Sequence, residues 1–170
     1  MVMEASGGVM TREYIAGSPI RVLASGPAGG VIGSAHVGLA KGHPNLLCVD
    51  MGGTSYDISM VLNGTAPAVA GWNMHHRYLV GVPMVQVETL GAGGGSICHV
   101  NNGGVEVGPA SAGSEPGPIC YGRGGTSPTI TDALLILGIL SADSDFAGGS
   151  FSLSRTGVDE AFGKIGEQMG

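Results

Sequence analysis

Hydrophobic and polar positions along the chain predict short strands and a few helices, separated by glycine-rich turns. Residues 46–50 are apolar up to Val49 and lead into a turn with two glycines. Residues 56–63 then alternate between polar and apolar positions and include β-branched side chains. Both segments are predicted to be strands, because β-branched residues and a two-residue period suit a pleated surface. Asn63-Gly64 follows the second strand and is typical of a tight hairpin turn.

Three helices are predicted, over residues 27–41, 133–140 and 158–168. Ser25 is expected to cap the first helix, which is rich in small residues and should end near Gly42-His43-Pro44. Thr131 and Asp132 are expected to cap the second helix.

The remaining apolar segments predict further extended structure. They comprise a short strand at 20–23, an extended segment at 82–90, and a hairpin of 96–100 and 104–108 that turns across Asn101-Asn102-Gly103. Strands come first and helices follow, as expected of half of an α/β fold.

Residues 52–55, here called the Gly-Gly turn, carry the strongest candidate chemistry. Adjacent glycines put no Cβ between backbone N–H groups and a ligand, so a phosphate can approach the main chain closely. Asp50 and Asp57 flank the turn and supply carboxylates that could hold the waters of a Mg2+ ion. A hairpin turn that binds nothing fits the bare pattern equally well. The candidate binding residues of the turn are Gly52, Gly53, Thr54 and Ser55.

Residues 91–96, here called the triple-glycine loop, form a second candidate. Consecutive glycines ahead of a serine expose several N–H donors, so the loop could be an anion cradle. The alternative is a close crossing of two backbones, where glycine is needed only for space. The candidate residues of the loop are Gly93, Gly94, Gly95 and Ser96.

Arg123 lies among glycines and could present its guanidinium group to a phosphate or a carboxylate. A loop arginine paired with Glu115 or Asp132 is the alternative. Asp132 itself is expected to be a helix cap and not a catalytic base. His75 and His76 are adjacent, so in an extended chain they point to opposite faces and do not suggest one metal ion.

Composition narrows the function classes. Charged residues make up 12% of the 170 residues, glycine accounts for 33, and the net charge is −6. The acidic balance, without a Lys/Arg cluster, argues against nucleic-acid or anionic-membrane partners. Cys48, Cys98 and Cys120 are widely spaced and odd in number, which suits a reducing compartment, so we expect a cytoplasmic protein.

Five blocks of sequence in order resemble the hydantoinase A / 5-oxoprolinase family, within the superfamily of actin, hexokinase and heat-shock chaperone ATPases. They are residues 25–30, 50–55, 91–97, 108–125 and 128–133. The resemblance implies an α/β fold, namely part of a ribonuclease H-like, actin-type ATPase lobe with a mixed sheet, flanking helices and glycine-rich loops. It also implies that residues 1–170 form a single partial domain, the start of the second lobe.

The resemblance further implies ATP and Mg2+ as cofactors of an enzyme that opens cyclic amides or carboxylates ketones by phosphoryl transfer. Asp50 and Asp57 are then the catalytic carboxylates, with Asp50 as the metal ligand, and the resemblance favours an active-site role for the triple-glycine loop. Arg123 is counted with the candidate cofactor-binding residues because of its guanidinium group. Implied partners are the rest of a hydantoinase A-type subunit, a B-type subunit and a small-molecule substrate.

ATPases of that superfamily also need a phosphate turn from the other lobe and an adenosine loop. Neither occurs in these residues, so we expect the chain alone to offer half a nucleotide site and to be inactive. Two alternatives stay open, a non-catalytic nucleotide switch and a structural piece of a larger assembly.

Overall fold

A computed structural model describes residues 1–74, 78–144, 146–149 and 151–170. By its internal contacts the chain divides into two compact units. Unit 1 comprises residues 1–50 and 57–89, and unit 2 comprises residues 51–56 and 90–170. The prediction of one partial domain is not tested by this division.

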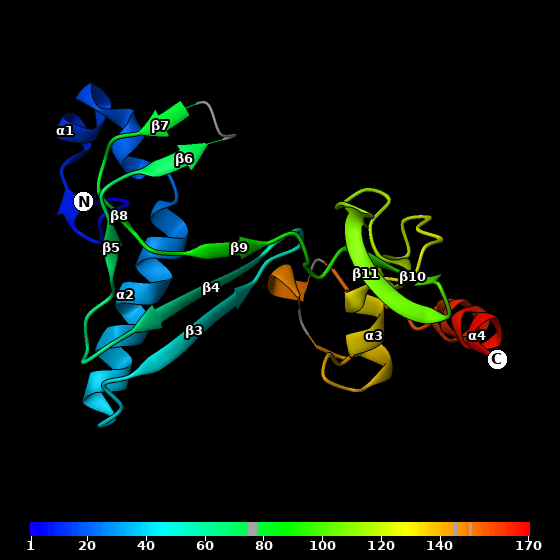
Figure 1. The fold of residues 1–170 in the computed structure, drawn as a ribbon. Helices are drawn as coiled ribbons and strands as arrows, with labels where there is room; N and C mark the ends of the chain where they lie inside the picture. The colour runs from blue at the N-terminus through cyan, green and yellow to red at the C-terminus, as the bar shows by residue number, and fades with distance from the viewer. Residues whose placement is uncertain (75–77, 145, 150) are drawn as a thin grey trace. The chain divides into compact units, whose positions relative to one another are not determined.

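Unit 1 combines a long helix with several short strands (Figure 1). Strands β3, β4 and β9 form a three-stranded sheet in that order, and β1–β2, β5–β8 and β6–β7 are antiparallel pairs. The elements are β1 (Val2–Met3), β2 (Val9–Met10), α1 (Arg12–Gly17), α2 (Ser25–Ala40), β3 (Leu46–Met51), β4 (Tyr56–Val61), β5 (Ala68–Val69), β6 (Trp72–Met74), β7 (Tyr78–Val80), β8 (Met84–Val85) and β9 (Glu88–Leu90).

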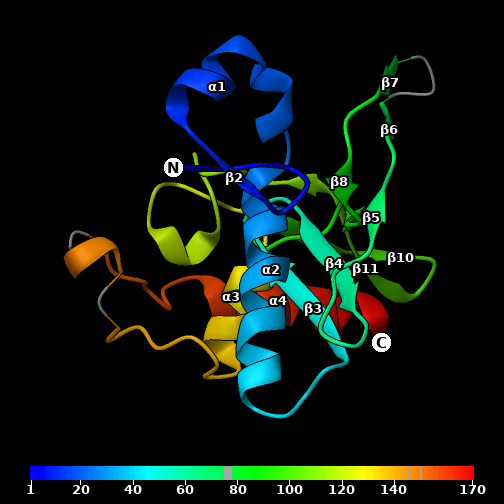
Figure 2. The same ribbon diagram turned by 90° about the vertical axis from the view of Figure 1, so that its left-hand side faces the viewer.

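One face of α2 forms the core of unit 1. Ala28, Val31 and Ala35 lie on this face and are buried against Val61 of β4 and Val85 of β8. Their spacing of three and four residues is that of a helix face turned to a core. Figure 2 looks onto α2 with β3 and β4 behind it.

The start of α2 corrects the sequence analysis. Its N-cap is Ala24, in a left-handed conformation with φ of 56°, and no side chain caps the helix. Ser25 is therefore the first helical residue and not the cap. The expected end is confirmed, because α2 stops at Ala40 and Gly42 follows with φ of 79°.

The predicted strand at residues 20–23 is wrong. Pro19–Val22 forms a 3-10 helix. Proline fixes φ near the helical value and suits the first turn of a helix, which outweighs the apolar run that follows it.

Unit 2 combines a long hairpin with two helices. Its elements are β10 (Ser96–Asn101), β11 (Gly104–Ser111), α3 (Ile130–Ile136) and α4 (Val158–Met169), with 3-10 turns at Ile119–Tyr121 and Ala147–Gly149. Asn102 and Gly103 have φ of 49° and 79°, which confirms the predicted hairpin turn. The core of the unit contains Cys120, Leu135, Leu153 and Val158.

Helix α3 begins and ends earlier than predicted. Thr129 is the N-cap, and Asp132 closes a capping box three residues later. The helix ends at Ile136, and Gly138 has φ of 71°, so the apolar residues that follow are not helical. Helix α4 matches its prediction to within one residue.

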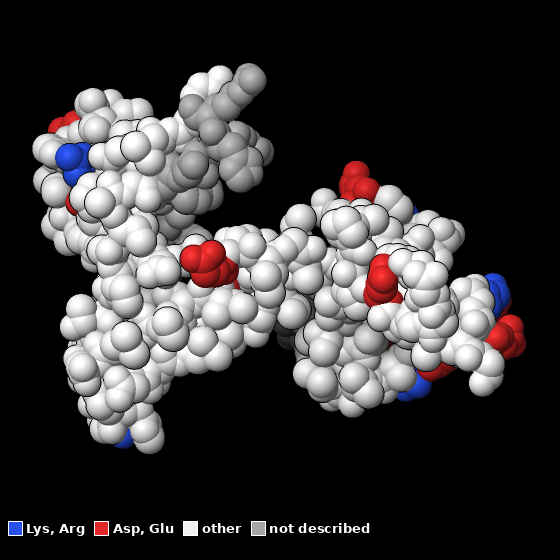
Figure 3. All heavy atoms as spheres, in the orientation of Figure 1, with Lys and Arg blue, Asp and Glu red and all other residues white. Residues whose placement is uncertain are grey.

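The surface of unit 1 bears few charges around its main strands. Leu47, Val49 and Met60 are each more than half exposed. In Figure 3 mostly white spheres lie over β3 and β4, with a red patch towards β9. No helix within the described residues is long and apolar enough to cross a membrane.

Candidate functional site

The Gly-Gly turn joins β3 to β4 and is exposed at Gly52, Gly53 and Thr54. Gly52 N donates to Ser55 O at 2.9 Å, which closes the turn. Within the described residues of unit 2, the N–H groups of Gly53, Thr54 and Ser55 donate to no backbone or side-chain acceptor. Within the described residues of unit 2, these three consecutive N–H groups are therefore not used by the protein. Strand β4 starts at Tyr56, which confirms that a strand and not a helix follows the turn.

The fold itself does not require glycine at position 53. Gly53 is not among the residues with positive φ, and a Cβ built on it would meet no atom within 4 Å. A Cβ on Gly52 would make only an ordinary contact, 3.7 Å from Ser55 O. Because no protein atom uses the space beside Gly53, a phosphate could approach this backbone closely.

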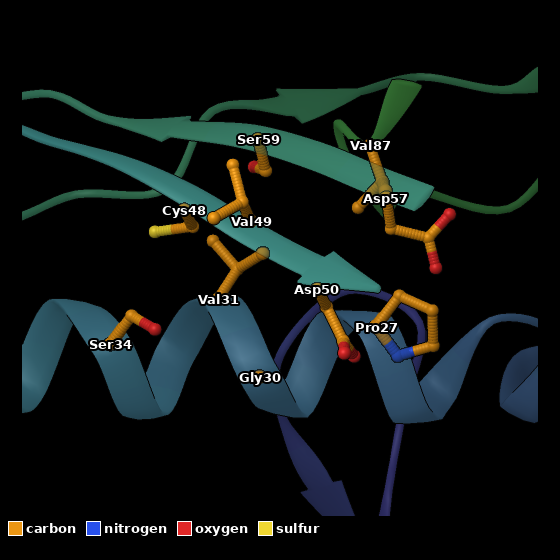
Figure 4. A pocket seen from close by; sticks show the side chains of 10 residues that line it. All are labelled: Pro27, Gly30, Val31, Ser34, Cys48, Val49, Asp50, Asp57, Ser59 and Val87. Carbon is orange, nitrogen blue, oxygen red and sulfur yellow. The ribbon is translucent and has the colours of Figure 1, made fainter. Parts of the chain in front are cut away.

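Asp50 and Asp57 both line a cavity of about 180 Å³ within unit 1. Gly30 and Ser34 of helix α2 line the same cavity, and their absent or short side chains leave room in it. Figure 4 shows the Asp50 carboxylate beside the first turns of α2. Carboxylate oxygens suit Mg2+, which binds through one or two carboxylates and keeps several waters.

The two carboxylates differ in their surroundings. Asp57 is half-buried, and its Oδ1 accepts a hydrogen bond from Thr89 Oγ1 at 2.6 Å, which fixes its orientation. Asp50 is exposed. Among the described residues, no three His, Cys, Asp or Glu side chains gather as a metal cluster. A metal ion here would therefore rely on water and a bound phosphate for its other ligands.

Two N–H groups of the triple-glycine loop hold the Gly-Gly turn. Gly94 N donates to Gly52 O at 2.9 Å. Gly95 N donates to Gly53 O at 2.7 Å. All four residues belong to unit 2. The loop thus satisfies two carbonyl groups of the turn and accepts no hydrogen bond from the N–H groups of Gly53, Thr54 and Ser55.

Two further donors of the loop, at Gly93 and Ser96, are used inside it. Gly93 N donates to Ser96 Oγ at 2.8 Å, and Ser96 N donates to Gly93 O at 2.9 Å. Ser96 is only 1% exposed. A Cβ on Gly93 would lie 2.6 Å from Thr54 N, so the two backbones cross closely. The geometry favours the close crossing over an anion cradle. The assignment of Gly93, Gly94, Gly95 and Ser96 as cofactor ligands stays a prediction.

Arg123 lies over aromatic rings. Its guanidinium carbon is 4.9 Å from the ring centroid of Phe151 and 5.9 Å from that of Tyr121, distances typical of cation–π contacts. The ion pairs of the described residues include none between Arg123 and Glu115 or Asp132, so the expected alternative pairing is wrong. Its role in cofactor binding stays a prediction.

Asp132 is a structural carboxylate, as expected. It is 0% exposed and accepts hydrogen bonds from Cys120 N at 2.7 Å and from Thr129 N and Oγ1 at 2.9 and 2.8 Å. A longer bond of 3.2 Å comes from Ile119 N. These bonds tie the start of α3 to the neighbouring 3-10 turn, so Asp132 is not placed to act as a base.

All three cysteines are free, and two of them have a raised pKa, so their thiols are protonated at neutral pH. Burial, and then the hydrogen bond to Asp132, raises the pKa of Cys120 to about 12. Burial, and then the charge of Asp132, also raises the pKa of Cys98. Cys48 packs against the core of unit 1, as expected. His75 and His76 lie outside the described residues.

Thr131 supports the site and was not among the predicted site residues. Its backbone N and its Oγ1 both donate to Gly94 O, each at 2.8 Å. The block at 128–133 was noted, but nothing in the sequence indicated that Thr131 meets a glycine 37 positions earlier.

The fold and the turn together define a class, a mixed α/β protein with a strand, a glycine turn that offers backbone donors, and a second strand. A family model of hydantoinase/oxoprolinase matches residues 1–170. The chain belongs to this family.

Several characterised proteins are similar to the chain. It is 44% identical to the caprolactamase subunit alpha of Pseudomonas jessenii over 98% of the chain, and 39% identical to the acetophenone carboxylase gamma subunit of Aromatoleum aromaticum over 88%. A nucleotide-free structure of acetone carboxylase, an ATP-dependent enzyme, matches 98% of the chain with a TM-score of 0.76 at 32% identity.

The chain is much shorter than these relatives. It spans 24% of the caprolactamase subunit, 21% of the acetophenone carboxylase subunit and 23% of the acetone carboxylase chain. The predicted family and the α/β fold class are confirmed by these matches.

Proposed function

We propose that this chain supplies the phosphate-binding turn and the magnesium carboxylate of an ATP-dependent enzyme, which activates a cyclic amide or a ketone by phosphoryl transfer for hydrolysis or carboxylation. The observation that carries this proposal is Gly53, an exposed glycine with open space beside it and an N–H that has no acceptor among the described residues of unit 2. Similar proteins support both hydrolysis and carboxylation, since they include a caprolactamase and carboxylases of acetophenone and acetone.

The residues divide the work by their chemistry. The backbone N–H groups of Gly53, Thr54 and Ser55 would hold phosphate oxygens, because consecutive free amides form an anion-binding concavity. Asp50 would hold Mg2+ through its exposed carboxylate, and Asp57, fixed by Thr89, would act as the second carboxylate. When bound, Mg-ATP supplies a phosphoryl group that can be transferred to the oxygen of an otherwise unreactive amide or ketone.

The chain would work within a larger assembly. Several relatives are named as subunits, which supports a hydantoinase B-type partner and the remainder of a hydantoinase A-type subunit. One turn alone leaves most of a nucleotide in water, so residues 1–170 by themselves should not turn over ATP. A cytoplasmic location is part of the same proposal and agrees with three free cysteines.

Replacement of Gly53 by valine in the complete protein tests the proposal. The backbone permits a side chain at this position, so the variant should fold, but the side chain fills the space that a phosphate needs. ATP turnover should fall by roughly a hundredfold or more.

The matched control is Gly104→Val in the other hairpin. Gly104 is also exposed, does not have a positive φ, and its nearest neighbour to a new Cβ is Asn101 O at 3.8 Å. The control should keep wild-type turnover. Wild-type turnover in Gly53→Val would remove the turn from the active site.

A further inference from the structure

We propose that Thr131 is a positioning residue for the Gly-Gly turn: it fixes the triple-glycine loop, and the loop fixes the turn. This inference rests on the proposed function, because the benefit of a fixed turn is phosphate binding. The contacts that carry it all lie within unit 2.

The path from Thr131 to the turn passes through one residue. Thr131 N and Thr131 Oγ1 both donate to Gly94 O at 2.8 Å. Gly94 N in turn donates to Gly52 O at 2.9 Å. The carbonyl group of Gly94 is therefore bound by α3, and the N–H group of Gly94 binds the turn.

The crossing leaves little room for the loop to shift. A Cβ on Gly94 would lie 2.8 Å from Thr131 Oγ1, and a Cβ on Gly95 would lie 3.0 Å from Gly53 O. Real side chains almost never come so close, so glycine at these positions allows the hydroxyl and the turn to meet the loop directly. A displaced loop would displace the turn with it.

Thr131 is itself held firmly. It is the second residue of α3 and only 9% exposed. The next residue, Asp132, accepts four hydrogen bonds from three residues and is fully buried. The hydroxyl is therefore presented from a rigid base.

The turn depends on this support, because it has little packing of its own. Gly53 and Thr54 are exposed, and no atom lies within 4 Å of the Cβ position on Gly53. Donors bind an anion best when their positions are set before it arrives, because less ordering is then needed on binding. Looser donors bind phosphate less well in the ground state, so the expected signature is a raised KM for Mg-ATP.

The experiment compares Thr131→Val, which keeps the shape and removes the hydroxyl, with Thr131→Ser, which keeps the hydroxyl. Both are measured in the complete protein for the KM for Mg-ATP, for kcat and for amide hydrogen exchange in residues 51–56 and 91–96. Thr156→Val, at an exposed threonine of the same unit, is the matched control.

For Thr131→Val we expect the KM to rise about three- to tenfold, as for the loss of one hydrogen bond, with a smaller change in kcat. Exchange in the two segments should become faster, while Thr131→Ser and Thr156→Val stay close to wild type. Unchanged KM and exchange in Thr131→Val, or equal defects in Thr131→Val and Thr131→Ser, would overturn the positioning role.

The proposed ATP-dependent function and the positioning role of Thr131 are contradicted by different results. If the wild-type protein turns over no ATP, the proposed function is wrong, and the exchange rates alone then decide whether Thr131 holds the turn. If Thr131→Val does not fold, Thr131→Ala removes the same hydroxyl without a branched side chain and takes its place in both measurements.

Discussion

The Gly-Gly turn and the triple-glycine loop look alike in sequence and are opposite in structure. In the turn, a Cβ on Gly53 meets nothing, and three consecutive N–H groups have no protein acceptor within unit 2. In the loop, a Cβ on Gly93 meets the backbone of Thr54 at 2.6 Å, and each of the four N–H groups from Gly93 to Ser96 donates to a protein oxygen. The turn has the geometry expected of the proposed phosphate site, and the loop holds the turn through the bonds to Gly52 O and Gly53 O.

Glycine content therefore does not by itself identify a phosphate site. Two physical questions separate the cases: what a Cβ would meet, and where each N–H donates. Glycine at 93 is needed by the fold, whereas glycine at 53 is not, so only the latter suggests a ligand.

We expect the largest loss of stability from a substitution at Asp132, the residue next to Thr131, which binds the loop. Asp132→Ala removes a buried acceptor and leaves its four donors without partners. The free energy of unfolding should fall by at least about 3 kcal/mol in a denaturant titration, with loss of ATP turnover. Asp143→Ala, at an exposed aspartate, is the control and should change stability by less than about 0.5 kcal/mol. An Asp132→Ala protein as stable as the control would contradict the structural role.

Two alanine variants, with a smaller expected effect on stability, compare the loop and the turn directly. Gly93→Ala places a Cβ against the backbone of Thr54, so stability should fall by about 1–3 kcal/mol and ATP turnover should fall with it. Gly53→Ala places the same group in open space and should leave the thermal midpoint unchanged while turnover falls. Equal losses of stability in the two variants would remove the distinction between the two glycine segments.

The smallest expected effect concerns the alkylation rates of two cysteine thiols, Cys120 in the core of unit 2 and Cys48 at the cavity in unit 1. The pKa of Cys120 is raised to about 12, so at pH 8 the folded protein keeps this thiol protonated and unreactive, and reactivity would need a pH near 12. Cys48 is half-buried and lines the cavity with Asp50 and Asp57. Iodoacetamide should label Cys48 first, and Mg-ATP should slow that labelling in the complete protein. Faster labelling of Cys120 would show that the core of unit 2 is open in solution.

Much of the fold could be predicted, because its signals are local. The hairpin turns at Asn63-Gly64 and Asn102-Gly103 have the positive φ values that their sequences favour. Errors came where one local signal competed with another. Pro19 turned an apolar run into a 3-10 helix, and the capping box of Thr129 and Asp132 set the start of α3 earlier than expected.

The site was only partly predictable. The turn and its flanking carboxylates follow from adjacent residues, and the cavity that Asp50 and Asp57 share agrees with that. The function of the triple-glycine loop depends on a contact between residues 93–95 and 52–54, and that of Thr131 on a contact across 37 positions. No local pattern encodes such contacts, because they are set by how the chain folds back on itself.

The central claim is that the Gly-Gly turn binds phosphate and the triple-glycine loop only supports it. A crystal structure of the complete protein with Mg2+ and a non-hydrolysable ATP analogue tests this most directly. The account predicts phosphate oxygens within hydrogen-bond distance of N–H groups among Gly53, Thr54 and Ser55, with the loop's bonds to Gly52 O and Gly53 O intact. Phosphates bound by the N–H groups of residues 93–96, or a turn without any phosphate contact, would contradict it.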